Sequence, residues 1–432
     1  MAADFYVHNL GCKVNRAESD LIAGALLSAG GALVRREDAE VIVINTCTVT
    51  AEAHAKTRKA VRRAAGEAGR PWVIATGCAI ALDREGFTAL GDKVIAEPDR
   101  LLAQERAAGL LGLGERPALE CEACLAGSGQ FNTRRGIKIQ DGCDNACSYC
   151  IVPAVRGVGA SRPLDEVCGQ VRAAEAAGAR EIVLTGVNIG AYRWDGKGLD
   201  ALLEELLADD GGAAWSGSAG GGQRQRRARL RLSSLEPQHV TQELLELMAR
   251  ERGRLCAHVH MPLQSGCDRT LAQMGRLYDT AFFAAKVDRL RGLLPHVALT
   301  TDVMVGFPGE SDDDFAQSLA FCEEMGFARM HVFRYSRRPG TPAAARADQV
   351  APEVSAARAA AMRSLAQAME LQDLKARVGS CEDVLVERDG RGRSESYHRV
   401  KVPHGIAAGA LVPMQFVAYR DTLLTGVPTE GY

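Results

Sequence analysis

Val41-Ile42-Val43-Ile44 decides the fold of the N-terminal region, because it is a short apolar run without alternating polar positions. Such a run is typical of a strand that is buried on both faces of a parallel sheet. Phe5-Tyr6-Val7-His8 and Trp72-Val73-Ile74-Ala75 are predicted strands before and after it, and the intervening segments 17–29 and 51–65 have helical patterns. The order strand, helix, strand, helix, strand predicts a parallel sheet with right-handed crossovers.

The same alternation resumes at residue 136 and continues for about two hundred residues. Helical segments such as 164–177 and 313–324 separate six predicted strands. These strands are 137–139, 181–184, 230–232, 258–260, 299–303 and 330–333. Six strands with intervening helices predict a parallel αβ barrel, complete or partial. A helix is predicted over 354–377, and the short β-like runs after it predict a small β-barrel.

The predicted fold class is therefore α/β, in three domains. An N-terminal parallel-sheet domain covers 1–110, a connector 111–132, a central partial (β/α) barrel 133–377 and a small β-barrel 378–432. Residues 209–229 interrupt the central barrel with Gly, Ser and Arg, which predicts a disordered surface insertion. The arginines of this stretch, up to and including Arg231, are expected to be solvated.

Composition gives broad limits on the class of protein. The 432 residues are 47% hydrophobic and 25% charged, as in an ordinary soluble protein with more than one domain. We expect no transmembrane helix, because no apolar run of about 18 residues occurs, and no secretory signal, so the protein is expected to be cytoplasmic. It is also expected to be a monomer. With a net charge of −2, any contact with nucleic acid must come from local basic patches.

Three of the thirteen cysteines form a C-x₃-C-x₂-C run, Cys143-Asp-Asn-Ala-Cys147-Ser-Tyr-Cys150. Cysteine thiolates hold iron–sulfur clusters, usually four to a cubane. A structural zinc site would need a fourth ligand at short spacing, and the run has none. The spacing therefore predicts a 4Fe–4S cluster with one open iron. Three unrelated thiols, or a degenerate zinc loop, are the alternatives.

A second set of cysteines is dispersed along the chain. Cys12, Cys47 and Cys78 each follow one of the first three predicted strands, 35 and 31 residues apart. Parallel strands end at the same edge of their sheet, where α/β proteins bind ligands, so the three thiols are expected to converge. This arrangement predicts a second three-cysteine 4Fe–4S cluster. The alternative is that these residues are ordinary small core side chains.

These motifs together resemble the methylthiotransferase family of radical S-adenosylmethionine enzymes. The resemblance covers nearly the whole chain and includes Leu10-Gly11-Cys12-Lys13-Val14-Asn15, Asn45-Thr46-Cys47-Thr48-Val49-Thr50 and the loop from Cys143 to Arg156. Further similar blocks are residues 233–237, 258–266, 306–310 and 335–342. The C-terminal β segment stands where the family has its TRAM domain, an RNA-binding β-barrel.

The resemblance implies a mechanism with two 4Fe–4S clusters and S-adenosylmethionine, in which the cofactors supply the radical chemistry. It implies that the cluster at Cys143, Cys147 and Cys150 passes an electron to S-adenosylmethionine, whose cleavage gives a 5′-deoxyadenosyl radical. The second cluster would hold the sulfur, and a second S-adenosylmethionine would supply the methyl group. An electron donor such as flavodoxin or ferredoxin is expected as a partner, and the source of sulfur stays open.

Further candidate cofactor contacts follow predicted barrel strands, because such barrels keep their active sites at that end. They are Thr185, Gly186, Asn188, Glu236, Gln264 and Ser265. A carboxylate at Glu236 could bind a ribose hydroxyl or the cofactor's ammonium. For each polar residue, ordinary capping of the loop backbone is an equally weighted alternative.

The sequences of the two N-terminal cysteine motifs, around Cys12 and Cys47, resemble the branch of the family that acts on N6-threonylcarbamoyladenosine in tRNA, 3′ of the anticodon. The isopentenyladenosine branch is the runner-up, followed by the branch that modifies an aspartate of a ribosomal protein. A non-catalytic RNA-binding protein with structural metal is a further alternative. From residue 379 onward, six Lys and Arg face seven Asp and Glu, which weakens the expectation of RNA binding there. Cys121 and Cys124 are expected to be incidental loop thiols.

Overall fold

The N-terminal domain is a five-stranded parallel sheet with the order β2-β1-β3-β4-β5 in our computed structural model, which describes residues 3–113, 134–208 and 227–429. The three predicted strands are confirmed, and two short strands extend the sheet at its edges. The strands are β1 (Ala3–Asn9), β2 (Gly31–Leu33), β3 (Val41–Thr46), β4 (Trp72–Gly77) and β5 (Val94–Ala96). All six residues of β3 are buried, as the continuous apolar run predicted.

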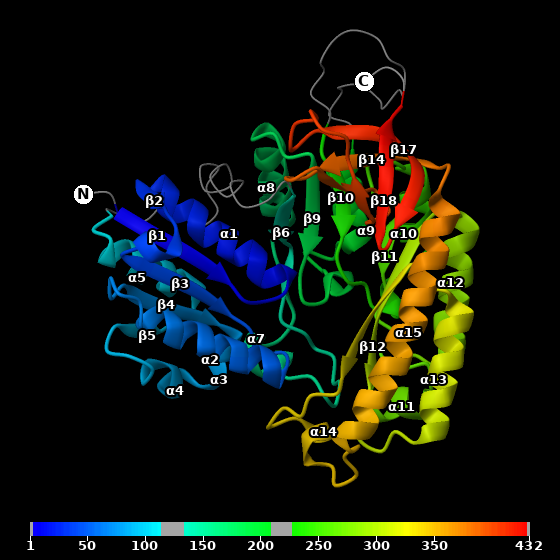
Figure 1. Cartoon of the computed structure of the whole chain (residues 1–432), viewed down its shortest axis with the longest axis horizontal. Helices are drawn as coiled ribbons and strands as arrows, with labels where there is room; N and C mark the ends of the chain where they lie inside the picture. Colours follow the sequence, from blue (N-terminus) through cyan, green and yellow to red (C-terminus); the bar gives the residue numbers. More distant parts are fainter. Residues whose placement is uncertain (1–2, 114–133, 209–226, 430–432) are drawn as a thin grey trace.

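Helices cover both faces of this sheet and close a hydrophobic core on each (Figure 1). On one face Ile42 and Ile44 pack with Val61 of α2, and on the other Val41 and Val43 pack with Ile22 of α1. The helices are α1 (Lys13–Ser28), the 3-10 turn η1 (Arg36–Asp38), α2 (Ala51–Ala65), α3 (Cys78–Leu82), α4 (Arg84–Thr88) and α5 (Arg100–Leu110). The sheet is thus fixed from both sides, and only the loops at its edges are available for a site.

The central domain is a partial barrel of six parallel strands, as predicted. Its two three-stranded sheets have the orders β10-β9-β6 and β11-β12-β13, and isolated bridges Leu230↔Leu255 and Ser234↔His260 join them. The strands are β6 (Arg135–Lys138), β9 (Glu181–Thr185), β10 (Arg229–Leu232), β11 (His258–His260), β12 (Ala298–Val305) and β13 (Arg329–Arg334), with a small hairpin β7 (Gln140–Asp141) and β8 (Ala160–Ser161).

Helices pack against the outside of these strands, and the N-terminal domain lies beside their open edge (Figure 1). The helices are α7 (Val152–Arg156), α8 (Leu164–Ala176), η3 (Ile189–Ala191), α9 (Leu199–Leu207), η4 (Pro237–His239), α10 (Gln242–Arg250), α11 (Asp268–Gln273), α12 (Thr280–Leu293), α13 (Asp312–Met325), α14 (Pro342–Ala345) and α15 (Pro352–Arg377). In the described parts of the chain, no helix is long and apolar enough to cross a membrane.

The C-terminal domain is a closed five-stranded barrel with the order β14-β15-β16-β18-β17. It lies at the end of the central barrel where β9 and β10 begin (Figure 1). Its strands are β14 (Cys381–Val386), β15 (Arg391–Ser394), β16 (Arg399–Lys401), β17 (Leu411–Arg420) and β18 (Leu423–Pro428). The small β-barrel predicted for this region is therefore confirmed.

The expected exposure of Arg229 and Arg231 is wrong, because both are completely buried in β10. They form ion pairs with Glu181 of β9 at 2.7 and 2.8 Å, and they donate hydrogen bonds to the backbone oxygens of Asp383, Arg393, Ser394 and Glu395 in the C-terminal barrel. The charges are tolerated in the interior because both guanidinium groups have carboxylate and carbonyl partners. Residues 209–226 of the predicted insertion lie outside the described residues, as do Cys121 and Cys124.

Candidate active site

Cys143, Cys147 and Cys150 lie on one loop that follows β7 and leads into α7. The loop is anchored by Gly142, whose φ is +66° and where a Cβ would stand 1.9 Å from the backbone oxygen of Val158. Only glycine allows this close approach. The backbone N–H groups of Asn145 and Val152 donate to the sulfurs of Cys143 and Cys150, each over 3.4 Å. The loop thus presents its thiols together with amide dipoles that favour thiolates.

An arginine from a distant part of the chain stands beside this loop. Arg276, just after α11, donates from Nη1 to the Cys147 sulfur over 3.2 Å and forms an ion pair with Glu236. The segment carrying it is tied to the loop, because the N–H of Ser148 donates to the backbone oxygen of Met274. Burial raises the pKa of the Cys150 thiol to about 11, so ligation of a metal there would release a proton.

Cys12, Cys47 and Cys78 meet at one edge of the N-terminal sheet. The strands β1, β3 and β4 end in step, since Asn9 pairs with Asn45 and Thr46 pairs with Gly77. Cys12 is exposed, while Cys47 and Cys78 are buried. Burial raises the pKa of the Cys47 thiol, and the nearby Cys12 and Cys78 raise it further. Cys12 and Cys78 are therefore both close enough to Cys47 to act on it electrostatically.

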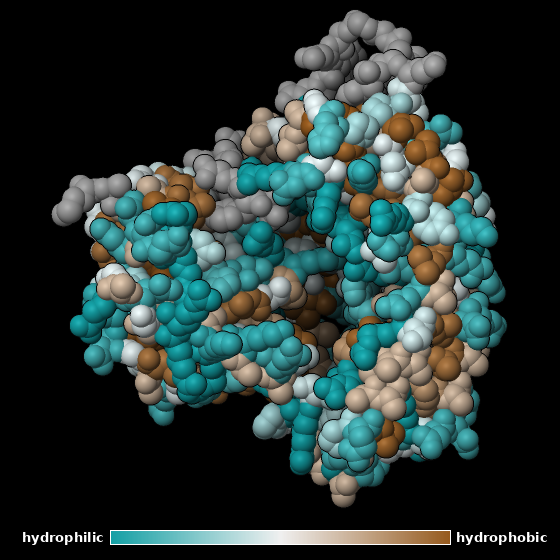
Figure 2. Space-filling view, in the orientation of Figure 1, coloured by the Kyte–Doolittle hydropathy of each residue, from teal (hydrophilic) through white to brown (hydrophobic). Residues whose placement is uncertain are grey.

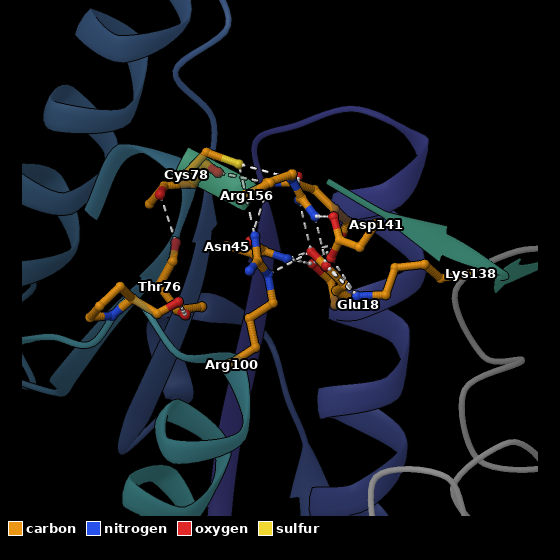
Figure 3. A network of polar contacts seen from close by, with 12 residues as sticks. Glu18, Asn45, Thr76, Cys78, Arg100, Lys138, Asp141 and Arg156 are labelled. Carbon is orange, nitrogen blue, oxygen red and sulfur yellow. Dashed lines mark hydrogen bonds and ion pairs between the residues drawn. The ribbon is translucent and has the colours of Figure 1, made fainter. Parts of the chain in front are cut away.

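Arg156 links this second set of cysteines to the first loop (Figure 3). Its Nε donates to the Cys78 sulfur over 3.2 Å, and its other nitrogens donate to Asp141 over 2.8 Å and to Glu18 over 3.0 Å. Lys138 and Arg100 also form ion pairs with Glu18. Burial alone would raise the pKa of Glu18, but the three cations lower it to about 2. Glu18 is thus an anion that fixes Arg156 beside Cys78.

Figure 2 shows a hollow between the N-terminal domain and the barrel, with a largely hydrophilic rim. At the carboxyl ends of the barrel strands, several buried polar atoms have no hydrogen-bond partner within the described residues. They are Thr185 Oγ1, Asn188 Oδ1, Ser233 Oγ and Gln264 Oε1. Buried polar groups are normally paired, so unpaired ones that gather at strand ends fit contact with a ligand.

The remaining candidate contacts are placed differently. Gly186 follows Thr185 and has no side chain to offer, so only its backbone is available. The Ser265 hydroxyl accepts a hydrogen bond from the N–H of Cys267 over 3.3 Å. This contact caps the loop backbone, which was the alternative to a cofactor contact for this residue. Gln264 has a left-handed φ of 69°, a conformation that costs a non-glycine residue about 1–3 kcal/mol and that is found at functional sites.

The cysteine triplets can be compared with the geometry of a site for a single metal ion. Within the described parts of the chain, no three His, Cys, Asp or Glu side chains stand close enough to hold one metal ion. A tetrahedral zinc site requires four ligands about 2.3 Å from one centre, whereas each thiolate of a cubane binds a different iron and stands further from the others.

Sequence reasoning missed the arginines next to the thiols. Arg276 lies more than a hundred residues from the loop that it contacts, and no local pattern marks it. Arg156 lies at the end of the loop that resembles the family, but its spacing gave no sign that it reaches Cys78. Basic residues near a predicted thiolate site are the signal to search for, since cations lower thiol pKa values.

Two family models match the chain. Residues 137–322 match the Radical SAM superfamily, and residues 4–96 match the Uncharacterized protein family UPF0004. Among solved structures, the radical S-adenosylmethionine methyltransferase TsrM from Kitasatospora setae has a TM-score of 0.55 at 14% identity, covering 79% of this chain and 75% of that one. This likeness supports the fold over the part of the chain that it covers.

Curated relatives match over most of the chain. The threonylcarbamoyladenosine tRNA methylthiotransferase MtaB of Bacillus subtilis is 36% identical, covering 79% of this chain and 76% of the relative. The ribosomal protein uS12 methylthiotransferase RimO of Anaeromyxobacter sp. is 35% identical, with 99% and 90% covered. The tRNA-2-methylthio-N(6)-dimethylallyladenosine synthase of Sorangium cellulosum is 34% identical, with 94% and 84% covered.

The fold and the matched barrel define a radical S-adenosylmethionine enzyme. With relatives of this identity and coverage, the chain belongs to the methylthiotransferase family of these enzymes.

Proposed function

We propose that this enzyme transfers a methylthio group to C2 of N6-threonylcarbamoyladenosine in tRNA, at the adenosine 3′ of the anticodon. The observation that carries the proposal is the 36% identity to the Bacillus subtilis threonylcarbamoyladenosine tRNA methylthiotransferase. The protein partner expected for catalysis is an electron donor such as flavodoxin or ferredoxin, with tRNA as the substrate.

Each cysteine triplet is proposed to hold one 4Fe–4S cluster. Cys143, Cys147 and Cys150 would hold the cluster that binds S-adenosylmethionine. When both are bound, the cluster and S-adenosylmethionine supply reductive cleavage of the cofactor, which gives the radical needed at an unactivated carbon. Arg276 would hold the Cys147 thiolate in place and neutralise part of its charge, since its guanidinium lies 3.2 Å from the sulfur.

Cys12, Cys47 and Cys78 would hold the second cluster, at which the transferred sulfur resides. Arg156 would play there the part that Arg276 plays at the first, because it donates to Cys78. Its ion pairs with Glu18 and Asp141 hold the guanidinium beside the Cys78 sulfur. The two sites would thus be held at a fixed separation by Arg156, which belongs to the segment that follows the first cysteine loop.

The polar residues at the strand ends would hold S-adenosylmethionine. Thr185, Asn188 and Gln264 each have a buried oxygen without a partner among the described residues, which supports their assignment to this ligand. Glu236 and Arg276 form a charged pair beside the cysteine loop, within reach of a zwitterionic amino-acid group. Gly186 would contribute backbone contacts, and Ser265 would shape the loop that carries Gln264.

The test is mass spectrometry of tRNA nucleosides from a strain that lacks the gene, with and without the gene restored. We expect 2-methylthio-N6-threonylcarbamoyladenosine to disappear and to return with the gene. Loss of 2-methylthio-isopentenyladenosine instead would move the enzyme to the branch of the Sorangium relative. Unchanged tRNA would contradict the proposal and direct attention to the ribosomal protein named for the Anaeromyxobacter relative.

A further inference from the structure

Tyr397 of the C-terminal barrel is the point at which all three domains meet. Its ring lies within 4.8 to 5.6 Å of four cationic groups, measured from ring centroid to charge, and its centroid is 4.8 Å from that of the tilted His258 ring. The cationic residues are Lys13 of the N-terminal domain, Arg134 and Arg231 of the central domain, and Arg393 of the C-terminal barrel. We call this group the junction cluster.

Two of the four cations already have carboxylate partners. Arg231 is saturated by Glu181, and Arg134 forms an ion pair with Glu387 at 3.2 Å. Lys13 and Arg393 differ, because no carboxylate of the described residues lies within ion-pairing distance of either, although Asp302 acts electrostatically on Lys13 and Glu387 on Arg393. Arg393 donates to the backbone oxygen of Tyr397 over 3.1 Å, yet its Nε is buried without a partner in the same part of the chain. The junction cluster therefore has two cations without a direct ion pair among the described residues.

The excess charge affects the phenol at its centre. Burial would raise the pKa of Tyr397, but Lys13 and Arg134 outweigh that effect and lower the pKa to about 8. The residue also adopts a left-handed φ of 72°, which is unfavourable for an aromatic side chain. The N–H of Tyr397 donates to Ser394 over 3.0 Å and so helps to hold this turn. The turn directs the ring into the group of cations.

Lys13 connects this cluster with the candidate active site. It directly follows Cys12, and part of its surface is exposed, while burial among residues of the central and C-terminal domains lowers the pKa of its ammonium group. Asp302 is near enough to act electrostatically on both Lys13 and Glu236, and it forms an ion pair with His260 at 3.3 Å. An accessible cation thus stands between the dispersed cysteines and the strand ends, at the junction with the C-terminal barrel.

We propose that Lys13 and Arg393 form a binding site for an anionic group of the substrate RNA. This inference rests on the proposed function, because it takes an RNA as the ligand. Two groups on such an RNA have the required chemistry: the carboxylate of the threonylcarbamoyl substituent and a backbone phosphate. An isopentenyl substituent is apolar and offers nothing to a cation, so the first source would make Lys13 a determinant of specificity.

The experiment measures dissociation constants of the cluster-loaded enzyme for three anticodon stem-loops, without reductant. The stem-loops carry N6-threonylcarbamoyladenosine, N6-isopentenyladenosine or adenosine at the target position. Lys13→Gln is compared with Lys13→Arg, which keeps the charge, and with Lys56→Gln, an exposed lysine of the same domain that pairs with Glu52. Iron content and thermal midpoint of each variant show whether its fold and clusters are intact.

We expect Lys13→Gln to weaken binding by about tenfold or more, since it removes a charge-assisted contact, while the other two variants bind nearly as the unchanged enzyme does. Weakening confined to the threonylcarbamoyl stem-loop identifies the carboxylate. Equal weakening for all three, with a salt slope smaller by about one, identifies a phosphate. Wild-type affinity of Lys13→Gln for all three stem-loops overturns the proposal.

A second variant keeps the test decisive if Lys13→Gln disturbs the neighbouring Cys12. Arg393→Gln removes the other unpaired cation from a different domain, and the same loss of affinity is expected. If Arg393→Gln folds and binds all three stem-loops normally, the junction cluster is only a structural contact. A substrate other than threonylcarbamoyladenosine would contradict the proposed function, yet the phosphate arm of this test would still decide on the anion site.

Discussion

The two cysteine triplets are brought together by opposite routes. Cys143, Cys147 and Cys150 lie within eight residues of one loop, so their proximity is a property of local sequence. Cys12, Cys47 and Cys78 are brought together only when β1, β3 and β4 pair in register. A spacing motif reports the first site directly, whereas the second depends on sheet topology. Any change that disturbs the N-terminal sheet should therefore affect the second triplet first.

The largest effect that separates the two triplets is expected from removing one ligand of each. Cys150→Ala should abolish formation of 5′-deoxyadenosine, because the proposed cofactor-binding cluster loses a ligand. Cys47→Ala should retain cofactor cleavage but form no methylthiolated product. Chromatography of 5′-deoxyadenosine and mass spectrometry of the RNA measure the two activities on the same samples.

Iron analysis gives the control for this pair. Each variant should contain about half the iron of the unchanged protein if each loses one of two similar clusters. Cys168→Ala is the matched control, because Cys168 is buried in the barrel core and belongs to neither triplet. Cofactor cleavage by Cys150→Ala at the normal rate would remove the local triplet from its proposed role.

An intermediate effect is expected from acid, acting through Glu18. Its pKa in the folded protein is about 2, below the ordinary value of 4.5, so its ion pairs stabilise the fold fully above about pH 5 and lose that contribution as the pH falls toward 2. We expect the cluster-free chain to lose about 2 kcal/mol more of its free energy of unfolding between pH 7 and 3 than Glu18→Gln does. Urea unfolding at several pH values measures this difference, and parallel pH curves for the two proteins would contradict it.

The smallest effect, and the sharpest comparison, is expected from the two arginines. Arg276→Gln removes a donor to Cys147, and Arg156→Gln removes a donor to Cys78. Loss of one charge-assisted hydrogen bond is worth about tenfold in rate. We therefore expect Arg276→Gln to slow cofactor cleavage and Arg156→Gln to slow thiolation alone. Electron paramagnetic resonance should show that each variant changes the signal of one cluster, and that the affected cluster differs between the two variants. The same altered signal in both variants would contradict the assignment of each arginine to its own cluster.

Most of the fold was predictable because its elements have simple patterns. The buried run at β3 and the six barrel strands follow from apolar runs separated by helical segments, and each was found. The short edge strands β2 and β5 were not predicted. Convergence of the strand ends that carry Cys12, Cys47 and Cys78 followed from topology, without any local motif.

The failures concern residues whose role depends on contacts between domains. Arg229 and Arg231 read as part of a polar insertion, since a buried arginine in a strand is rare without partners. Their partners are Glu181 in the neighbouring strand and backbone oxygens about 150 to 165 residues away, which no window of sequence reveals. Lys13 and Tyr397 are a second example, because they meet only when the first and last domains pack on the barrel.

The buried group of Arg229, Arg231 and Glu181 holds the C-terminal barrel rigidly against the central domain. A domain joined only by a flexible linker samples many positions. The effective concentration, at the active site, of a ligand bound to such a domain depends on the length of the linker. Here four backbone oxygens of the C-terminal domain are held by guanidinium groups that are themselves fixed inside β10. These contacts thus fix the position of the C-terminal barrel relative to the central domain.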